Sequence, residues 1–255
     1  MQQKPNNDIQ IKVRNQPLSI FAALSNNMDI KENLNRIKAG LPEGVRLVAV
    51  SKTHPAEMLK EAYDAGQRIF GENKVQEMTA KSQVLPADIE WHFIGHVQRN
   101  KIHIMAPYVS VIQGVDSFDK LAEIDRQAAR FNRHITCLLQ LHIAQEETKF
   151  GFTPDECTAM LEQCDWRSLK NITIGGVMGM ASNTDNETQV LGEFRTLRNI
   201  FDSYKEKYFF DNPDFNTISA GMSGDYKLAI QAGSNMVRIG SSIFGERNYQ
   251  LNNNY

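Results

Sequence analysis

The sequence is poor in cysteine, has a net charge near zero and has no long apolar run, and each of these absences argues against a class of protein. Its three cysteines, Cys137, Cys157 and Cys164, follow no paired motif, which favours free thiols in a reducing compartment over a disulfide scaffold. The net charge of −2 gives no electrostatic reason to expect nucleic acid or a membrane surface as a partner. No apolar stretch approaches the ~20 residues of a membrane span, and residues 1–7 lack the apolar core of a signal peptide. We therefore expect a cytoplasmic protein.

What the sequence does contain is a regular alternation of short apolar runs and helical patterns. The predicted strands are Arg46–Ser51, Arg68–Gly71, Glu90–Ile94, Val109–Gly114, Ile135–Ile143, Ile172–Val177, Phe215–Ala220 and Met236–Ile239. The predicted helices between them are Pro55–Ala65, Lys74–Val84, Val97–Met105, Ser117–Phe131, Thr153–Gln163, Thr184–Tyr208 and Asp225–Ala232. Strict alternation implies parallel strands, and eight units suit a single (β/α)8 TIM barrel. An open doubly wound sheet is the alternative, but the turn at residues 51–55 has no glycine, so the dinucleotide fingerprint is absent.

The same patterns divide the chain into three parts. Residues 1–17 are polar and are expected to form a flexible arm, residues 18–249 the barrel, and residues 250–255 a flexible, asparagine-rich tail. Apolar spacing over Leu18–Ala39 predicts one helix or two short ones ahead of the first strand. Capping boxes beginning at Thr153 and Thr184 predict where two of the later helices start.

A lysine ends the first predicted strand. The run Leu47-Val48-Ala49-Val50-Ser51 has the length of a buried strand and stops at Lys52. The carboxyl end of a parallel strand is where barrels build their ligand sites. A solvated lysine is the ordinary alternative at such a position.

Two turns rich in glycine and serine follow the last two predicted strands. Gly221-Met222-Ser223-Gly224 comes after the seventh, and Gly240-Ser241-Ser242 after the eighth. TIM barrels frequently bind phosphate at this place, through backbone N–H groups and hydroxyls. A lysine facing a phosphate site suggests Schiff-base chemistry, once burial lowers its pKa from about 10.4. Two ligand classes fit, a sugar phosphate with a carbonyl group and pyridoxal 5′-phosphate (PLP).

Several stretches resemble the YggS/PROSC family of pyridoxal phosphate homeostasis proteins, which is related to the N-terminal barrel of alanine racemase. The matching stretches are Ala49–Thr53, Phe70–Asn73, Trp91–Gly95 with Gln98 and Asn100-Lys101, Gly221–Ser223, and Val237–Gly240 with Ile243–Arg247. The resemblance implies a fold-type III PLP barrel with an extra N-terminal helix. The sequence departs from the usual family pattern at Leu141–Ile143, at His96 and at Gln113–Asp116. None of these departures falls on the lysine, phosphate or arginine positions.

The resemblance also implies a role for individual residues. Lys52 would hold PLP as an internal aldimine, and Ser223, Gly240 and Ser241 would bind its phosphate. Arg238 would face the pyridine nitrogen, and Asn73 would line the pocket. These six residues are the candidate cofactor-binding site.

The expected function follows from that set. A guanidinium facing the ring nitrogen donates a hydrogen bond without giving up its proton, so the bound cofactor is a poor electron sink. Alanine racemase also needs a tyrosine from a C-terminal domain that we expect this chain to lack. We therefore expect a non-catalytic PLP carrier. The alternatives are a PLP-dependent amino-acid racemase of low activity and a sugar-phosphate aldolase that uses Lys52. The expected partners are PLP and apo PLP-dependent enzymes, and we expect a monomer.

Two further candidates have plainer interpretations. His92 and His96 are four residues apart but span a strand and its loop, so core and loop roles are favoured over a zinc site. Lys149 follows the fifth strand, where a solvated lysine and a secondary cofactor contact are equally plausible.

Overall fold

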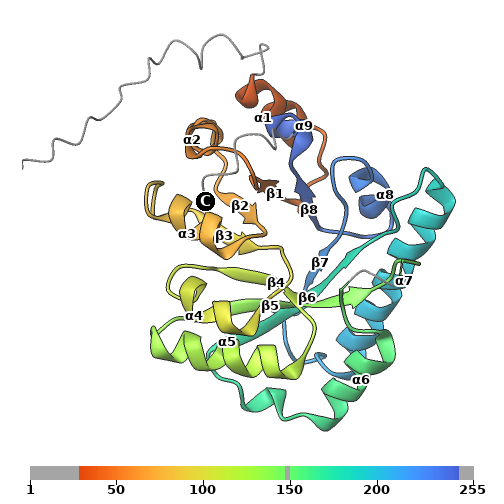
Figure 1. Cartoon of the computed structure of the whole chain (residues 1–255). Helices are drawn as coiled ribbons and strands as arrows, with labels where there is room; N and C mark the ends of the chain where they lie inside the picture. Colours follow the sequence, from red (N-terminus) through yellow and green to blue (C-terminus); the bar gives the residue numbers. More distant parts are fainter. Residues whose placement is uncertain (1–28, 147–149, 247–255) are drawn as a thin grey trace, which may run out of the picture.

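A closed ring of eight parallel strands forms the centre of the molecule in the computed structural model, which describes residues 29–146 and 150–246 (Figure 1). The strands run in chain order, and β1 closes the ring by pairing with β8. Their bounds are β1 Arg46–Val50, β2 Ile69–Glu72, β3 Glu90–Phe93, β4 Val111–Val115, β5 Ile135–His142, β6 Ile172–Met180, β7 Thr217–Ser219 and β8 Met236–Ile239. The predicted (β/α)8 barrel is confirmed.

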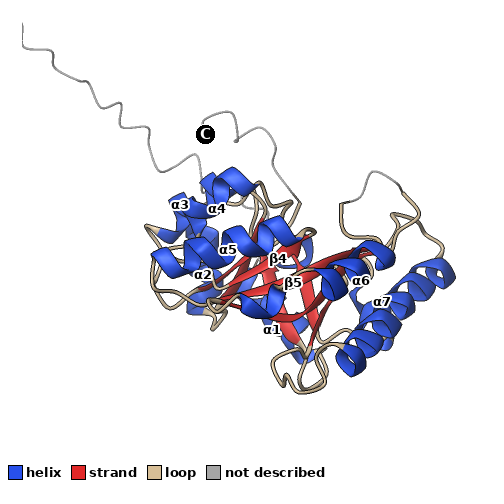
Figure 2. Ribbon diagram, turned by 90° about the horizontal axis from the view of Figure 1, so that it is seen from below, coloured by secondary structure: helices blue, strands red, loops and turns tan. Residues whose placement is uncertain are grey.

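Helices surround the ring (Figure 2). Apolar side chains fill the layer between the helices and the strands. The α-helices are α1 Ile30–Ala39, α2 Ala56–Asp64, α3 Val75–Ser82, α4 Ile102–Met105, α5 Phe118–Arg130, α6 Pro154–Gln163, α7 Glu187–Lys207, α8 Tyr226–Gln231 and α9 Ser241–Phe244. In α5, Leu121, Ile124 and Ala128 are fully buried, as their spacing along one helix face predicts. None of the helices in the described part of the chain has the length and apolar character needed to cross a bilayer.

The extra N-terminal helix is α1. Asp29 caps it by accepting a hydrogen bond from the Glu32 N–H at 2.8 Å, and α1 lies beside α9 (Figure 1). The prediction of helix over Leu18–Ala39 is confirmed for its second half. Residues 18–28, the expected arm at 1–17 and the expected tail at 250–255 lie outside the described residues.

Three differences between the predicted elements and the structure go beyond shifts of one or two residues at an element's end or affect a predicted cap. Val97–Met105 is not one helix: it contains a 3-10 turn at Arg99–Lys101 and the single-turn α4, because burial of Val97 and Met105 produces the apolar spacing without a continuous helix. The capping box at Thr184 is wrong, since Asn186 caps α7 two residues later and accepts from the Gln189 N–H. The box at Thr153 is confirmed.

The third difference concerns β6, which continues past the predicted end at Val177 to Met180. β5 is long too, and the pairs Gln140↔Met178 and His142↔Met180 carry the ladder onward. Met178 and Gly179 therefore lie inside a strand instead of in the loop after it. This extension brings a β6 carbonyl to the candidate site.

Candidate functional site

Lys52 leaves the barrel at the carboxyl end of β1, beside the end of β8. Ala49 pairs with Ile239, so the next residues, Val50 and Gly240, are level with each other. The two backbones lie so close that a Cβ on Gly240 would come within 2.9 Å of the Val50 carbonyl oxygen. The half-buried Lys52 follows two residues after Val50, at the same end of the barrel.

The two glycine- and serine-rich turns meet at this end. The N–H of Gly240 donates to the hydroxyl of Ser223 at 3.3 Å. Gly221 has a φ of +94°, a conformation that favours glycine, and its carbonyl accepts from the Arg238 N–H at 3.0 Å. Ser241 is the first residue of α9, so the N–H groups of a helix start add to the donors from the two turns. The structure thus brings Ser223, Gly240 and Ser241 together.

Arg238 is a buried cation in β8, with only 4% of its surface exposed. Its guanidinium donates to the carbonyl and the hydroxyl of Ser219 at 2.8 and 2.7 Å, and to the Gly179 carbonyl at 3.0 Å. Burial lowers the pKa of Arg238 to about 10, against the charge of Asp225, which raises it. The side chain therefore stays positively charged at neutral pH.

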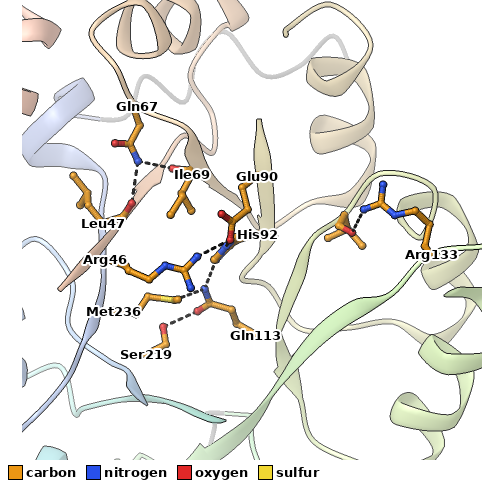
Figure 3. A network of polar contacts seen from close by, with 11 residues as sticks. Arg46, Leu47, Gln67, Ile69, Glu90, His92, Gln113, Arg133, Ser219 and Met236 are labelled. Atoms are coloured by element: carbon orange, nitrogen blue, oxygen red, sulfur yellow. Dashed lines mark hydrogen bonds and ion pairs between the residues drawn. The ribbon is translucent and has the colours of Figure 1, made fainter. Parts of the chain in front are cut away.

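A chain of hydrogen bonds runs from Ser219 through the barrel interior to its opposite end (Figure 3). The Ser219 hydroxyl donates to the Gln113 amide oxygen at 2.7 Å, and the Gln113 amide nitrogen lies 2.9 Å from His92 Nδ1. His92 Nε2 lies 2.8 Å from the Glu90 carboxylate, which also pairs with Arg46 at 2.6 Å. We call this series, from Arg46 to Ser219, the interior chain.

The donors and acceptors of the interior chain fix the state of His92. Because the Gln113 oxygen accepts from Ser219, its NH2 group must donate to Nδ1, which leaves the ring proton on Nε2 facing Glu90. Burial lowers the pKa of His92, outweighing the hydrogen bond that His92 donates to Glu90, which raises it. His92 is thus a neutral core histidine. Sequence reasoning assigned it to the core but did not find its partners, Glu90 in β3 and Gln113 in β4.

Asn73 follows β2, on the side of β1 opposite the glycine- and serine-rich turn after β8. Val50 pairs with Gly71, so Asn73 and Lys52 each follow two residues after a matched pair on neighbouring strands. Asn73 is exposed and lines a cavity of about 340 Å³ together with Gly95, His96 and Lys101. His96 stacks on Phe150 with ring centroids 4.0 Å apart. Lys149, the other candidate from the sequence, lies outside the described residues.

The cysteines take no part in this arrangement. Cys137 is fully buried in β5 and Cys157 in α6, and burial raises the pKa of both thiols, that of Cys157 to about 12. Both are therefore thiols packed in the core, as expected from the sequence. No cluster of three or more potential metal-binding side chains occurs within residues 29–146 and 150–246.

Comparison with known proteins identifies the family. The family described as alanine racemase, N-terminal domain, matches residues 26–248. A pyridoxal phosphate homeostasis protein of Haemophilus influenzae is 34% identical over 240 residues, which are 89% of this chain and 100% of the relative. One of Vibrio alginolyticus is 38% identical over 213 residues, 82% of this chain and 89% of the relative. The chain belongs to the YggS/PROSC family.

Solved structures agree with membership of the YggS/PROSC family. PipY of Synechococcus elongatus PCC7942, solved without PLP, superposes with a TM-score of 0.79 at 34% identity, covering 85% of this chain and 100% of PipY. The same protein with PLP bound gives a TM-score of 0.77 at 33% identity, covering the same shares of both chains. Alanine racemase of Clostridium difficile 630 shares the fold, with a TM-score of 0.68 at 16% identity over 86% of this chain and 56% of the racemase.

Proposed function

We propose that this chain binds PLP as a Schiff base on Lys52 and serves in cofactor homeostasis, holding and releasing PLP without robust turnover. The observation that carries the proposal is that three features lie at one end of the barrel. They are the carboxyl end of β1, which Lys52 follows, the hydrogen-bonded turns at Ser223 and Gly240, and the buried Arg238. The names of the relatives and the PLP-bound PipY support it.

The residues present fit the three distinctive groups of PLP. The Lys52 amine would condense with the aldehyde, forming the C=N bond as the C=O bond breaks and one water leaves. Ser223, Gly240 and Ser241 would supply hydroxyl and N–H donors for the phosphate, in a turn where Gly240 packs too closely on Val50 to admit a Cβ. Asn73 follows the strand next to β1 and would line the β2 side of the pocket.

Arg238 favours holding the cofactor over using it. PLP supplies an electron sink when its ring nitrogen is protonated. The Arg238 guanidinium is charged at neutral pH and presents only donors, so it would satisfy that nitrogen without protonating it. The arginine would thus weaken the electron withdrawal that racemisation and transamination require.

The recipients in this proposal are apo PLP-dependent enzymes, and the chain acts as a monomer in the cytoplasm. Its three cysteines are free, which suits a reducing compartment. A carrier needs a bond to its cargo that can be reversed. A Schiff base on a half-buried strand-end lysine meets that need, because water or another amine can displace it.

The test is a visible absorption spectrum of the purified protein with PLP, followed by borohydride reduction and peptide mapping. A yellow protein whose reduced adduct lies on Lys52 is expected. Lys52→Ala should abolish the adduct, while Lys60→Ala, at an exposed lysine paired with Asp64, should retain it. A colourless protein that traps sugar-phosphate carbonyls on Lys52 would replace the proposal with an aldolase.

A second candidate, an amino-acid racemase of low activity, has one observation in its favour, the racemase-type barrel over 86% of this chain. The two functions are separated by measuring steady-state racemisation alongside PLP transfer to an apo-enzyme. Transfer with negligible racemisation supports the carrier. Robust turnover would overturn it.

A further inference from the structure

A buried cluster of charged residues lies directly behind the turn that carries Lys52. Glu72, at the end of β2, is fully buried, and Lys81 in α3 is 6% exposed. The Lys81 ammonium donates to Glu72 at 2.7 Å, to Glu77 at 2.8 Å and to the carbonyl oxygen of Ser51 at 2.8 Å. We call Glu72, Glu77 and Lys81 the turn cluster.

The turn cluster contacts both chain neighbours of Lys52. On one side, the Ser51 hydroxyl donates to Glu72 at 2.6 Å, in addition to the bond from Lys81 to the Ser51 carbonyl. On the other side, the Thr53 N–H donates to the Glu77 carboxylate at 2.6 Å. Hydrogen bonds to charged groups are stronger than those between neutral groups. The backbone before and after Lys52 is therefore anchored to one buried cluster.

Thr53 is held in a conformation that its own side chain opposes. Its φ is +70°, in the left-handed region that a β-branched residue rarely adopts. Its hydroxyl oxygen is buried and has no hydrogen-bond partner within residues 29–146 and 150–246. Neither feature favours this turn, so an external contact must hold it. The bond from the Thr53 N–H to Glu77 is the side-chain contact made by this residue, and it acts together with the bond from the His54 N–H to the Ser51 carbonyl at 3.1 Å.

We propose that Glu77, supported by Lys81 and Glu72, is a positioning residue that fixes the turn at Ser51–Thr53 and thereby sets the direction in which Lys52 leaves β1. This inference rests on the proposed Schiff base at Lys52. A cluster with only a structural role would stabilise the fold and leave the reaction of Lys52 with an aldehyde unchanged. The two roles can therefore be measured separately.

Glu77→Leu is the most informative substitution in the cluster. It removes the acceptor of the Thr53 N–H but leaves Lys81 paired with Glu72, so no buried charge loses its last partner. Glu57→Leu is the matched control, because Glu57 is an exposed glutamate in the first turn of the preceding helix, α2. Glu77→Gln keeps an oxygen acceptor and is the conservative variant.

The readouts on the full-length protein are the equilibrium and rate of Schiff-base formation with PLP, from visible absorbance and the borohydride-trapped fraction, together with the thermal midpoint of the apo-protein. Glu77→Leu should weaken Schiff-base formation about tenfold, the effect of one lost charge-assisted hydrogen bond. Glu77→Gln should retain most of it, and Glu57→Leu should match the wild type.

A double variant decides between positioning and general destabilisation. Glycine adopts a positive φ without strain, so Thr53→Gly in the Glu77→Leu background should restore Schiff-base formation and removes the unpaired hydroxyl. If Glu77→Leu reacts as the wild type does, or if Thr53→Gly restores nothing, the positioning role is overturned. If the wild type itself forms no adduct on Lys52, the proposed function fails, which is a different result from either.

Discussion

One guanidinium nitrogen of Arg238 donates to both the carbonyl and the hydroxyl of Ser219, at 2.8 and 2.7 Å. The other terminal nitrogen donates to the carbonyl of Gly179 at 3.0 Å. A charge on β8 is thus held by acceptors on β7 and β6, and the Ser219 hydroxyl in turn donates a hydrogen bond to the Gln113 amide oxygen. The orientation of the arginine that would face the cofactor therefore depends on β6, which carries no candidate phosphate or lysine contact, as well as on β7.

Ser219→Ala should destabilise the protein and weaken PLP binding together. The change removes one acceptor of Arg238 and one donor to Gln113, all three of them buried, and such losses cost about 1–3 kcal/mol. Urea unfolding of the apo-protein and PLP titration measure the two effects. Ser168→Ala, at a serine that donates to a carbonyl in an exposed turn, is the control and should change stability by less than about 0.5 kcal/mol. Unaltered PLP affinity in Ser219→Ala would contradict the role given to Arg238.

Gln113→Leu should cost more alone than it adds to Ser219→Ala. By itself it leaves the Ser219 hydroxyl and His92 Nδ1 buried without their partner, at about 1–3 kcal/mol for each group. In the double variant the hydroxyl is already gone. The loss of unfolding free energy in the double variant should therefore be smaller than the sum of the losses in the two single variants, by about 0.5–3 kcal/mol. A double-mutant cycle in urea measures this coupling. Strict additivity would show that the interior chain is not one connected network.

Gly240→Ala should weaken binding of the phosphate group selectively. The new methyl would lie 2.9 Å from the Val50 carbonyl oxygen, so the turn after β8 must move away from β1. We expect the PLP dissociation constant to rise about tenfold, as for the loss of one or two good hydrogen bonds, with little change for pyridoxal, which has no phosphate. Gly192→Ala is the control, since nothing lies within 4 Å of that position and alanine favours its helix. An equal loss for both ligands would exclude a phosphate role for Gly240.

His92 should make the wild type less stable in mild acid. Burial lowers its pKa below the ordinary value of 6.5, so the unfolded chain takes up the proton first. The stability that His92 contributes is present above pH 6.5 and is lost as the pH falls toward the folded-state pKa, at up to about 1.4 kcal/mol per pH unit. His92→Gln can still accept from Gln113 and donate to Glu90 but does not titrate. Its unfolding free energy relative to the wild type should therefore rise between pH 6.5 and pH 5, and a difference that is flat with pH would refute this assignment.

The sequence predicts the parts of the site that depend on local pattern. A buried strand that ends in Lys52, and small-residue turns after β7 and β8, can be read from short stretches because strand length and turn composition are local properties. Strict alternation then places all three at one end of the barrel. The family resemblance adds the role of Arg238, which nothing in its own neighbourhood reveals.

The parts that the sequence does not predict depend on distant partners. Ser219, Gln113 and His92 come from three separate strands, and each reads as an ordinary inward-facing polar residue until the barrel register aligns them. The positive φ of Thr53 has no signal in sequence, because threonine is not the residue that such a turn favours. The start of α7 was misplaced because Thr184 and Asn186 are both good caps, and only the fold selects Asn186.

The pairing of β1 with β8 has a consequence for how the site is assembled. On the ribosome, Lys52 emerges early, whereas Ser223, Arg238 and Gly240 emerge after nearly the whole barrel has been synthesised. A contact between such distant segments forms late and slowly. A ligand that contacts residues on both β1 and β8 binds only the closed barrel, so by mass action it stabilises the folded chain. PLP bound in this way would therefore stabilise the closed barrel that holds it.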